Sequence, residues 1–432
     1  MTDHHRPNVV ILYADDLGWG DLGCFGAADI PTPHLDALCA GGVKLSQWSA
    51  NSPVCSPSRA SLLTGKYPAH AGVESILGGR RDTVGLPRQS TLASELRERG
   101  YATGLFGKWH LGVDPAYAPM RYGFDEVFGL RAGCVDYYSH IFYWGRDNPV
   151  HDLWDGDDEV WLNGEYLTTV IGRRAADFIT RHASADPFFC YVPFNAPHYP
   201  LHAPTEHMDR VAHLPPGRQE LAAMVAAMDD AIGEILTALD EAGLREDTLV
   251  VFSSDNGPSR ESRNWLGGEE ISYTGGSAGG LRGSKGSVFE GGIRVPSIAS
   301  WPGHLPAGTE FDEPGLMMDL LPTILHAVDG AEAELPEVDG VSLLEAWQGT
   351  ASAPERSLMW TYQGQWAVRR GRYKLVVGAR EGMDPPASVE RAVFDLEADP
   401  AESRDVSAEV PEVAAELEQE LQRWQERHAA WT

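Results

Sequence analysis

The nine residues NVVILYADD, Asn8 to Asp16, form an apolar run that ends abruptly in two acids. A run this short and apolar is typical of a strand buried on both faces of a parallel sheet. Three later stretches repeat the pattern and also end in polar residues: ATGLFGKWH (102–110), FFCYVPFNAPH (188–198) and TLVVFSSDNG (248–257). Because segments with helical periodicity separate these runs, the sequence predicts an α/β fold.

Two of the intervening segments carry clear helix signals. STLASELRERG (90–100) has Ser90 as its predicted N-cap and Gly100 as its C-terminal stop. Apolar residues at helical spacing predict one face of a long helix that ends at Gly243: Leu221, Val225, Met228, Ile232, Ile235 and Leu239. Between residues 256 and 294 a stretch rich in glycine, serine and arginine has no sustained period, which predicts a long functional or disordered loop.

The last part of the chain has a different pattern. After Gly349, SLMWTYQGQWAVRRGRYKLVVG and RAVFDL alternate apolar and polar residues, and an acidic helical segment follows from Pro411 to His428. This order predicts a small antiparallel sheet with one helix packed on it. We therefore divide the chain into a large α/β domain, residues 1–350, and a C-terminal α+β subdomain, residues 351–432.

Composition excludes several classes of protein. The formal net charge of −29 would repel nucleic-acid phosphates, and no basic stripe offsets it. The five cysteines are odd in number and include no CxxC pair, so neither a disulfide framework nor a thiolate zinc site is expected. No apolar run approaches the ~20 residues that span a bilayer. We expect a soluble protein that binds neither nucleic acid nor membrane.

The amino terminus, MTDHHRPNVVILYADD, lacks the long apolar region and the small-residue cleavage site of a signal peptide. The sequence as it stands predicts a cytoplasmic protein, or an exported one if a leader has been removed. It predicts no oligomeric state.

Polar residues follow the predicted strands at the edge where parallel sheets bind ligands. Asp15 and Asp16 end the first run, and Asp255 and Asn256 end the fourth. Three carboxylates and an amide oxygen are hard ligands, which favour Ca²⁺ and, less strongly, Mg²⁺. The competing interpretation is that Asp15 and Asp255 cap the helices that follow. Because two such pairs occur at one edge, a metal site is favoured over two separate helix caps.

Cationic and proton-donating groups are expected beside this metal site, where they would bind an anion. Lys108, His110 and His198 stand at the ends of predicted strands. Arg59 and Lys285 could join them from loops. His202 competes with His198 for a role, although the position of His198 at a strand end favours it. His140 and His326 are isolated in sequence and are interpreted as structural.

Cys55 lies in an unusual place for a free cysteine. Such residues usually pack in apolar cores, but this one stands in a turn rich in proline and serine, NSPVCSPSRASLLTG (51–65). The run CSPSRASLLTG matches in full the signature C-x-P-S-R-x-x-x-x-T-G of type I sulfatases. The chain resembles this family, a branch of the alkaline phosphatase superfamily whose cysteine is oxidised to formylglycine.

Other segments resemble the family in the expected order along nearly the whole chain. They are ILYADDLGWGDLGCFG (11–26), GKWHLG (107–112), SDNGP (254–258), LRGSKGSVFEGGIRVP (281–296) and FDLEADPAESRDV (394–406). The resemblance implies a large mixed, mostly parallel sheet sandwiched by helices, as in alkaline phosphatase, with a small C-terminal subdomain. No residue after His110 in VDPAYAPMRYGFDEVFG (113–129) matches the further polar group that some sulfatases place in the sulfate pocket.

The resemblance also implies roles for individual residues. It implies that five residues bind calcium: Asp15, Asp16, Cys55 as formylglycine, Asp255 and Asn256. Arg59 would stabilise the formylglycine, and Lys108 and His110 would support its hydrated form. His198 and Lys285 would bind the sulfate and protonate the departing alcohol. One hydroxyl of the hydrate would attack sulfur, and the other would collapse to expel sulfate, a step that serine cannot perform.

The leading functional hypothesis is hydrolysis of a small or terminal sulfate ester of a sugar or an aryl alcohol, after maturation by a formylglycine-generating enzyme. A phosphonate monoester or phosphodiester hydrolase that uses the same formylglycine is one alternative, and an unmodified binding module is another. Three tryptophans could form platforms on which a sugar stacks: Trp144, Trp154 and Trp161. Tryptophans are just as often core residues. The acidic charge weakly favours small or terminal groups over long polyanions.

Overall fold

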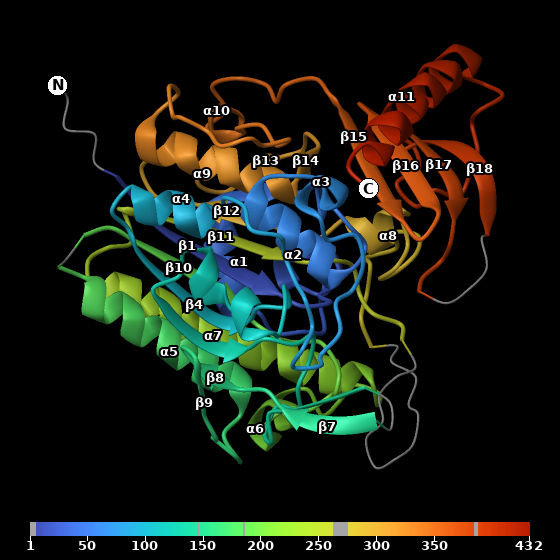
Figure 1. Ribbon diagram of the computed structural model, residues 1–432. Coiled ribbons are helices and arrows are strands. Elements are labelled where there is room, and N and C mark those ends of the chain that lie inside the picture. The colour runs from blue at the N-terminus through green and yellow to red at the C-terminus, as the bar shows by residue number, and fades with distance from the viewer. Residues whose placement is uncertain (1–5, 145–146, 185, 262–274, 384–387) are drawn as a thin grey trace.

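The computed structural model describes residues 6–144, 147–184, 186–261, 275–383 and 388–432, without the side chains of residues 143–148 (Figure 1). The centre of the described structure is a ten-stranded sheet. In spatial order its strands are β13 (Thr309–Phe311), β2 (Val43–Leu45), β12 (Ile298–Ser300), β11 (Thr248–Ser254), β1 (Asn8–Ala14), β10 (Phe188–Pro193), β4 (Ala102–Lys108), β5 (Glu126–Leu130), β8 (Trp154–Asp155) and β9 (Asp158–Glu159).

The middle of this sheet is parallel, and antiparallel pairs lie toward its edges. β1 pairs in parallel with β10 and β11, and β4 pairs in parallel with β10 and β5. β12 runs antiparallel to its neighbours, as does β8. The four apolar runs of the sequence are thus four adjacent central strands. The predicted mixed, mostly parallel sheet is confirmed.

Helices cover both faces of the sheet because alternate residues of the central strands enter two different cores (Figure 1). Val10 and Leu12 of β1 pack toward α1 (Pro33–Ala40), α5 (Leu167–His182) and α7 (Arg218–Glu241). Val9 and Ile11 pack toward α2 (Cys55–Thr64), α4 (Leu92–Glu98) and α9 (Leu320–Asp329). This explains why the strand is apolar at every position.

Shorter elements complete the main domain. They are β3 (Trp48–Ser49), which pairs with β14 (Gly315–Leu316), β6 (Ile141–Trp144), which pairs with β7 (Asp147–His151), α3 (Pro68–Ala71), α6 (Thr205–Arg210), α8 (Glu290–Ile293) and α10 (Leu344–Trp347). Short 3₁₀ turns span Gly23–Phe25, Pro115–Tyr117, Pro119–Tyr122 and Met317–Asp319. None of the described helices is long and apolar enough to cross a membrane.

One predicted helix boundary is wrong. The N-cap of α4 is Thr91, not Ser90, because the Thr91 hydroxyl accepts the backbone N–H of Ser94 and the Ser94 hydroxyl accepts the N–H of Thr91. This reciprocal pair satisfies two N–H groups that the first turn of a helix leaves open. The long helix is confirmed as α7, which ends at Glu241 shortly before Gly243.

The C-terminal part forms the expected small sheet. β15 (Ser357–Tyr362), β16 (Gln365–Arg370), β17 (Tyr373–Ala379) and β18 (Val389–Asp395) are antiparallel neighbours, and α11 (Pro411–Ala429) packs on them over a separate apolar core. The boundary that we predict at residue 350 falls between α10 and β15.

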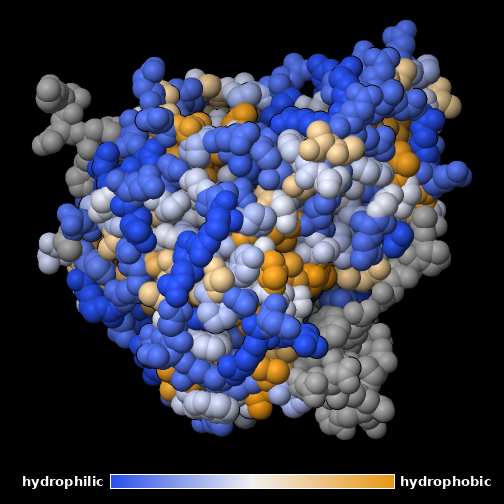
Figure 2. Space-filling model, in the orientation of Figure 1, coloured by the Kyte–Doolittle hydropathy of each residue, from blue (hydrophilic) through white to orange (hydrophobic). Residues whose placement is uncertain are grey.

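Figure 2 shows that mainly hydrophilic side chains cover the face in view.

A buried ion cluster joins this subdomain to the main domain. The Lys374 ammonium on β17 lies 2.8 Å from a carboxylate oxygen of Glu290 in α8 and 2.9 Å from one of Glu402. All three side chains are enclosed. Buried charges need partners, so this cluster fixes the subdomain against the segment that carries Lys285.

Candidate active site

Polar residues that the sequence predicts as site residues gather at one edge of the sheet. Asp15 and Asp16 follow β1, Asp255 and Asn256 follow β11, and Lys108 ends β4. The other predicted residues approach from α2 and from loops: Cys55, Arg59, His110, His198 and Lys285. All ten are buried, although several of them are charged. Charged groups are seldom enclosed unless they are paired or serve a function.

Acidic groups lie close enough together to hold a metal ion. Ligand atoms of Asp15, Cys55 and Asp255 lie within 4.8 Å of one another, and so do those of Asp15, Asp16 and His198. Oδ1 of Asp15 and Oδ1 of Asn256 are buried without a hydrogen-bond partner among the described residues. Such orphaned acceptors are costly, and a cation would satisfy both. The donor set therefore fits a metal bound through oxygen.

The alternative role of the acids as helix caps is wrong. No helix begins directly after Asp15 or Asp255 in the described structure. Oδ1 of Asp255 accepts the backbone N–H of Asp16 at 3.1 Å, which links the ends of β1 and β11. Asp16 itself has a φ of 64°, in the left-handed region that a non-glycine residue seldom adopts. Backbone strain of this kind is concentrated at functional sites.

Arg59 connects two of the carboxylates. Its Nε and Nη2 donate to Oδ2 of Asp255 at 3.0 and 2.7 Å, and Nη2 lies 3.5 Å from Oδ1 of Asp15. Its Nη1 donates to the backbone carbonyl of Lys108 at 3.0 Å. The Lys108 ammonium then donates to Oδ2 of Asp15 at 2.7 Å. These contacts orient the acids and balance part of their charge.

Lys285 occupies the other side of the cluster. Its Nζ donates to Oδ2 of Asp16 at 2.9 Å and lies 3.4 Å from Nε2 of His198. Burial acts to lower the pKa of Lys285, but Asp16 and Glu261 outweigh it and raise the pKa well above the ordinary value. Burial also acts to raise the pKa of Asp16, yet Lys285 and His198 lower it to about 2. The lysine is therefore an ammonium and the aspartate a carboxylate.

His198 is a neutral imidazole in this environment. Burial is the largest cause that lowers its pKa, to about 3. Its Nδ1 lies 2.7 Å from the carbonyl oxygen of Tyr199 and donates to it, which leaves Nε2 as an acceptor facing Lys285. His202 instead pairs with Asp136 at 3.1 Å. The structure thus places His198, and not His202, beside the predicted site.

Cys55 is the first residue of α2, at the amino end where backbone N–H groups favour an anion. Only 2% of the residue is exposed, and the rest of α2 is buried as well. Burial raises the pKa of the thiol to about 11, so the cysteine is protonated at neutral pH. An unmodified thiol at this position is a poor nucleophile.

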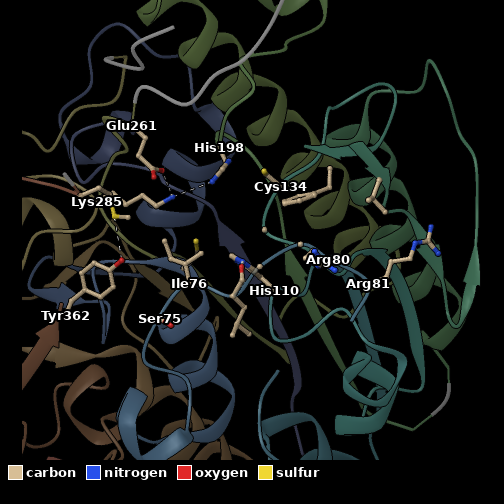
Figure 3. A pocket seen from close by; sticks show the side chains of 18 of the residues that line it. Ser75, Ile76, Arg80, Arg81, His110, Cys134, His198, Glu261, Lys285 and Tyr362 are labelled. Carbon is tan, nitrogen blue, oxygen red and sulfur yellow. Dashed lines mark hydrogen bonds and ion pairs between the residues drawn. The ribbon is translucent and has the colours of Figure 1, made fainter. Parts of the chain in front are cut away.

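A cavity of about 970 Å³ opens above these groups (Figure 3). Cys55, His110, His198 and Lys285 lie along it. Its walls come from several distant segments of the chain: Arg80, Arg81, Asp82, Cys134, Phe142, Val150, Glu261, Tyr362, Gln363 and Met383. The C-terminal subdomain contributes the last three, so both parts of the molecule shape the cavity. Mixed polar and apolar walls suit a small organic ligand.

The predicted tryptophan platform is not part of this cavity. Neither Trp154 nor Trp161 is among the described residues that line it. The Trp161 ring stacks on His151 with 3.6 Å between ring centroids, and the Arg131 guanidinium lies 4.1 Å from the ring centroid of Trp154. The side chain of Trp144 lies outside the described part of the structure.

Sequence reasoning missed most residues of the cavity walls, among them Cys134, Glu261 and Tyr362. Cys134 lies in a loop after β5, Glu261 follows the SDNGP segment, and Tyr362 ends β15. None of the three belongs to a recognisable motif, and neither Cys134 nor Glu261 belongs to a periodic apolar pattern. The sequence offered one signal for Glu261. It is the single acid in the polar stretch PSRES (258–262) and lies three residues after Pro258.

A sequence model of the Sulfatase family matches residues 7–331. The chain belongs to the sulfatase family. Human arylsulfatase A is 34% identical over 469 aligned positions, which cover 96% of this chain and 86% of the relative. N-acetylgalactosamine-6-sulfatase of Canis lupus familiaris is 35% identical and covers 85% of this chain, with 71% of the relative aligned. This sulfatase is accordingly a sulfuric ester hydrolase.

The fold of the sulfatase agrees with a solved relative. The crystal structure of Ps i-CgsB in complex with k-i-k-neocarrahexaose has a TM-score of 0.85 and 30% sequence identity, and the match covers 97% of this chain and 92% of that one. The similarity spans both the main domain and the C-terminal subdomain.

Proposed function

We propose that this sulfatase hydrolyses a sulfate ester of a sugar, with Cys55 converted to formylglycine and with Ca²⁺ bound by the acidic cluster. The observation that carries the proposal is the placement of Cys55, which lines the cavity, within 4.8 Å of carboxylate oxygens of Asp15 and Asp255. Calcium is preferred to magnesium because the ligand set is large and irregular.

When bound, the two groups would supply a nucleophilic hydroxyl from the hydrated aldehyde and a cation that neutralises charge on the sulfate oxygens. The chain holds and orients both. Asp15, Asp16, Asp255 and Asn256 would ligate the ion, while Arg59 fixes Asp255 through two hydrogen bonds. Because these residues are fully buried, water does not screen their charges, which strengthens each interaction.

The cations would bind the sulfate and assist the departing alcohol. The Lys285 ammonium can donate to a sulfate oxygen and is within reach of Nε2 of His198, at 3.4 Å. The anionic sulfate ester would raise the pKa of His198 and favour its imidazolium form, which would protonate the leaving oxygen. Lys108 donates to Asp15, a position from which it would support the hydrate, and His110 borders the same cavity.

A sugar is favoured over a simple aryl group by the size and polarity of the cavity. A volume of about 970 Å³ exceeds what a phenyl ring requires, and its walls include Arg80, Asp82, Glu261 and Gln363. Two relatives point the same way, since one is named for N-acetylgalactosamine and the other was solved with a neocarrahexaose. Hydrogen-bonding side chains of this kind suit a hydroxylated ligand.

The test uses protein co-produced with a formylglycine-generating enzyme. Peptide mass spectrometry should show a loss of about 18 Da at Cys55, as expected for conversion of a thiol to an aldehyde. Sulfate release is then measured from galactose and N-acetylgalactosamine 4- and 6-sulfates and from 4-nitrophenyl sulfate. Phenyl phosphonate monoesters are assayed in parallel.

We expect sulfate release that requires the modification, disappears in Cys55→Ala and is lost after dialysis against a calcium chelator. Calcium should restore it better than magnesium. A fully modified, calcium-loaded sample that cleaves only the phosphonate monoesters would contradict the proposal. So would equal activity of Cys55→Ala and the modified protein.

A further inference from the structure

Glu261 is a buried carboxylate in the wall of the cavity that the proposed chemistry does not use. Only 3% of the residue is exposed, and Figure 3 shows it next to Lys285 and His198. Its Oε2 lies 3.2 Å from Nζ of Lys285 and accepts a hydrogen bond from the Ser259 hydroxyl at 3.3 Å. Its Oε1 has no hydrogen-bond partner among the described residues.

A buried carboxylate oxygen without a partner is unfavourable, because the lost hydration is not replaced. Lys285 is paired with Asp16 at 2.9 Å and with Oε2 of Glu261 at 3.2 Å, so its neutralisation leaves Oε1 unused. Within a sulfate pocket a second carboxylate would also repel the anion. The position therefore indicates a ligand that donates a hydrogen bond to Oε1.

We propose that Glu261 binds the sugar part of the substrate, with Oε1 accepting a hydrogen bond from a hydroxyl close to the scissile sulfate ester. This inference rests on the proposed function. Lys285 touches both His198, the donor to the departing oxygen, and Glu261. Glu261 and His198 therefore contact the same ammonium, at 3.2 and 3.4 Å, so a hydroxyl near the departing oxygen would face the carboxylate.

The proposal defines a substrate class. A carboxylate accepts hydrogen bonds from hydroxyl groups and repels carboxylates and further sulfates. The alcohol should thus carry a free hydroxyl near the ester and no second anion at that position. A phenol without other substituents offers nothing for Glu261 to bind.

The experiment compares Glu261→Gln with the parent protein on matched substrates. The substrates are the best sugar sulfate of the panel above, its analogue with the nearest hydroxyl replaced by hydrogen, and 4-nitrophenyl sulfate. The readout is the ratio of kcat/KM between the sugar sulfate and its deoxy analogue. The variant would affect Lys285 equally with both substrates. The ratio of the two kcat/KM values therefore reports only the contribution of the hydroxyl.

The control variant is Glu337→Gln, the same change from acid to amide at a residue that does not line the cavity. The Glu337 side chain is 78% exposed and pairs with Lys66 at 3.4 Å. Circular dichroism and thermal unfolding show whether each variant folds like the parent.

We expect the parent protein to prefer the hydroxylated substrate about 10- to 100-fold, as for a hydrogen bond to a charged group. Glu261→Gln keeps an acceptor but loses its charge, so it should lower this ratio several-fold, while Glu337→Gln should retain it. A ratio that is equal in the parent and in Glu261→Gln would assign Glu261 to charge balance alone and overturn the proposal.

The two proposals fail in different ways. If the modified protein cleaves 4-nitrophenyl sulfate but no sugar sulfate, the sugar-binding role of Glu261 is wrong and sulfate ester hydrolysis stands. If it cleaves none of the sulfate esters, the proposed function fails together with this inference.

Discussion

Arg59 balances carboxylates that could not otherwise be buried together. Its side chain is fully enclosed, and its guanidinium contacts both Asp255 and Asp15. Removal of one partner from a buried charge cluster leaves the others uncompensated, which costs more than loss of a surface pair. The residue therefore contributes to stability as well as to the site.

Arg59→Gln should lower the free energy of unfolding by about 3–5 kcal/mol in the absence of metal. The measurement is urea unfolding at pH 7 with chelator present. The control is Arg173→Gln, which removes a contact at 2.9 Å to Glu165 between two half-exposed side chains and should cost less than about 1 kcal/mol. Equal losses in the two variants would contradict the buried-charge argument.

Lys285→Met should reduce kcat by about 10²- to 10³-fold, because it removes a cation from charge that develops during the reaction. The measurement is sulfate release by modified protein at saturating substrate. Lys44→Met is a suitable control, since its ammonium lies over the ring of Phe25, 4.8 Å from the centroid, and does not line the cavity. A fall in kcat of the same size in both variants would refute the role of Lys285.

Single residues show where sequence reasoning succeeds and where it stops. Asp15, Asp255 and Lys108 could be predicted because they follow apolar strands, and strand ends meet at one edge. Glu261 and Cys134 could not, because loops bring them to the cavity and no periodic pattern determines where a loop passes.

Among the elements, α1 is held at its amino end by a residue of another helix. Its own N-cap position, Thr32, makes no side-chain capping bond. Asp229 of α7 instead accepts the backbone N–H groups of His34 and Leu35, at 3.0 and 2.8 Å. A single carboxylate thus caps one helix and docks it on a second.

This cap should make stability depend on pH. Burial raises the pKa of Asp229 from 3.8 to about 6, so the folded protein binds this proton more tightly than the unfolded chain. The contribution is complete below about pH 4, falls as the pH rises through the window from 4 to 6, and is constant above it. Asp229→Asn should remove this fall, which urea unfolding between pH 4 and 7 would detect. Parallel pH profiles for the two proteins would contradict it.

At the level of elements, the sequence predicted the central strands and the long helix well because each has one clear periodic signal. The start of α4 was misplaced by one residue, since Ser90 and Thr91 are both good caps and only the geometry of Ser94 decides between them. Strand order across the sheet and the crossing of loops depend on long-range contacts, which a single sequence without a family resemblance does not reveal.

The molecule as a whole depends on the buried cluster of Lys374, Glu290 and Glu402. Burial raises the pKa of Glu402 to about 7, and although burial also acts to raise that of Glu290, Lys374 and Arg294 outweigh it and lower the pKa below the ordinary value. Lys374 is the cation that both carboxylates share. The cluster links the small sheet to the main domain.

Lys374→Met should lower the free energy of unfolding by about 3–5 kcal/mol, because Glu402 would stay buried without its cation and Glu290 would keep only Arg294. The double variant Lys374→Met/Glu402→Gln should recover part of the loss, since one of the two charges is then absent. Urea unfolding of both variants checks this. A double variant less stable than the single one would show that the pairing argument is wrong.

Different sheets carry the rim of the cavity, formed by Tyr362 and Gln363, and its floor, formed by the reactive groups. Tyr362 and Gln363 come from the end of β15 and the turn that follows, whereas the reactive groups stand at the ends of strands of the large sheet. Mutations in that turn can therefore alter which alcohol is admitted without moving the groups that break the bond. Such a separation makes the scaffold evolvable, and a library randomised only at these rim positions should yield changed selectivity with little loss of folded protein.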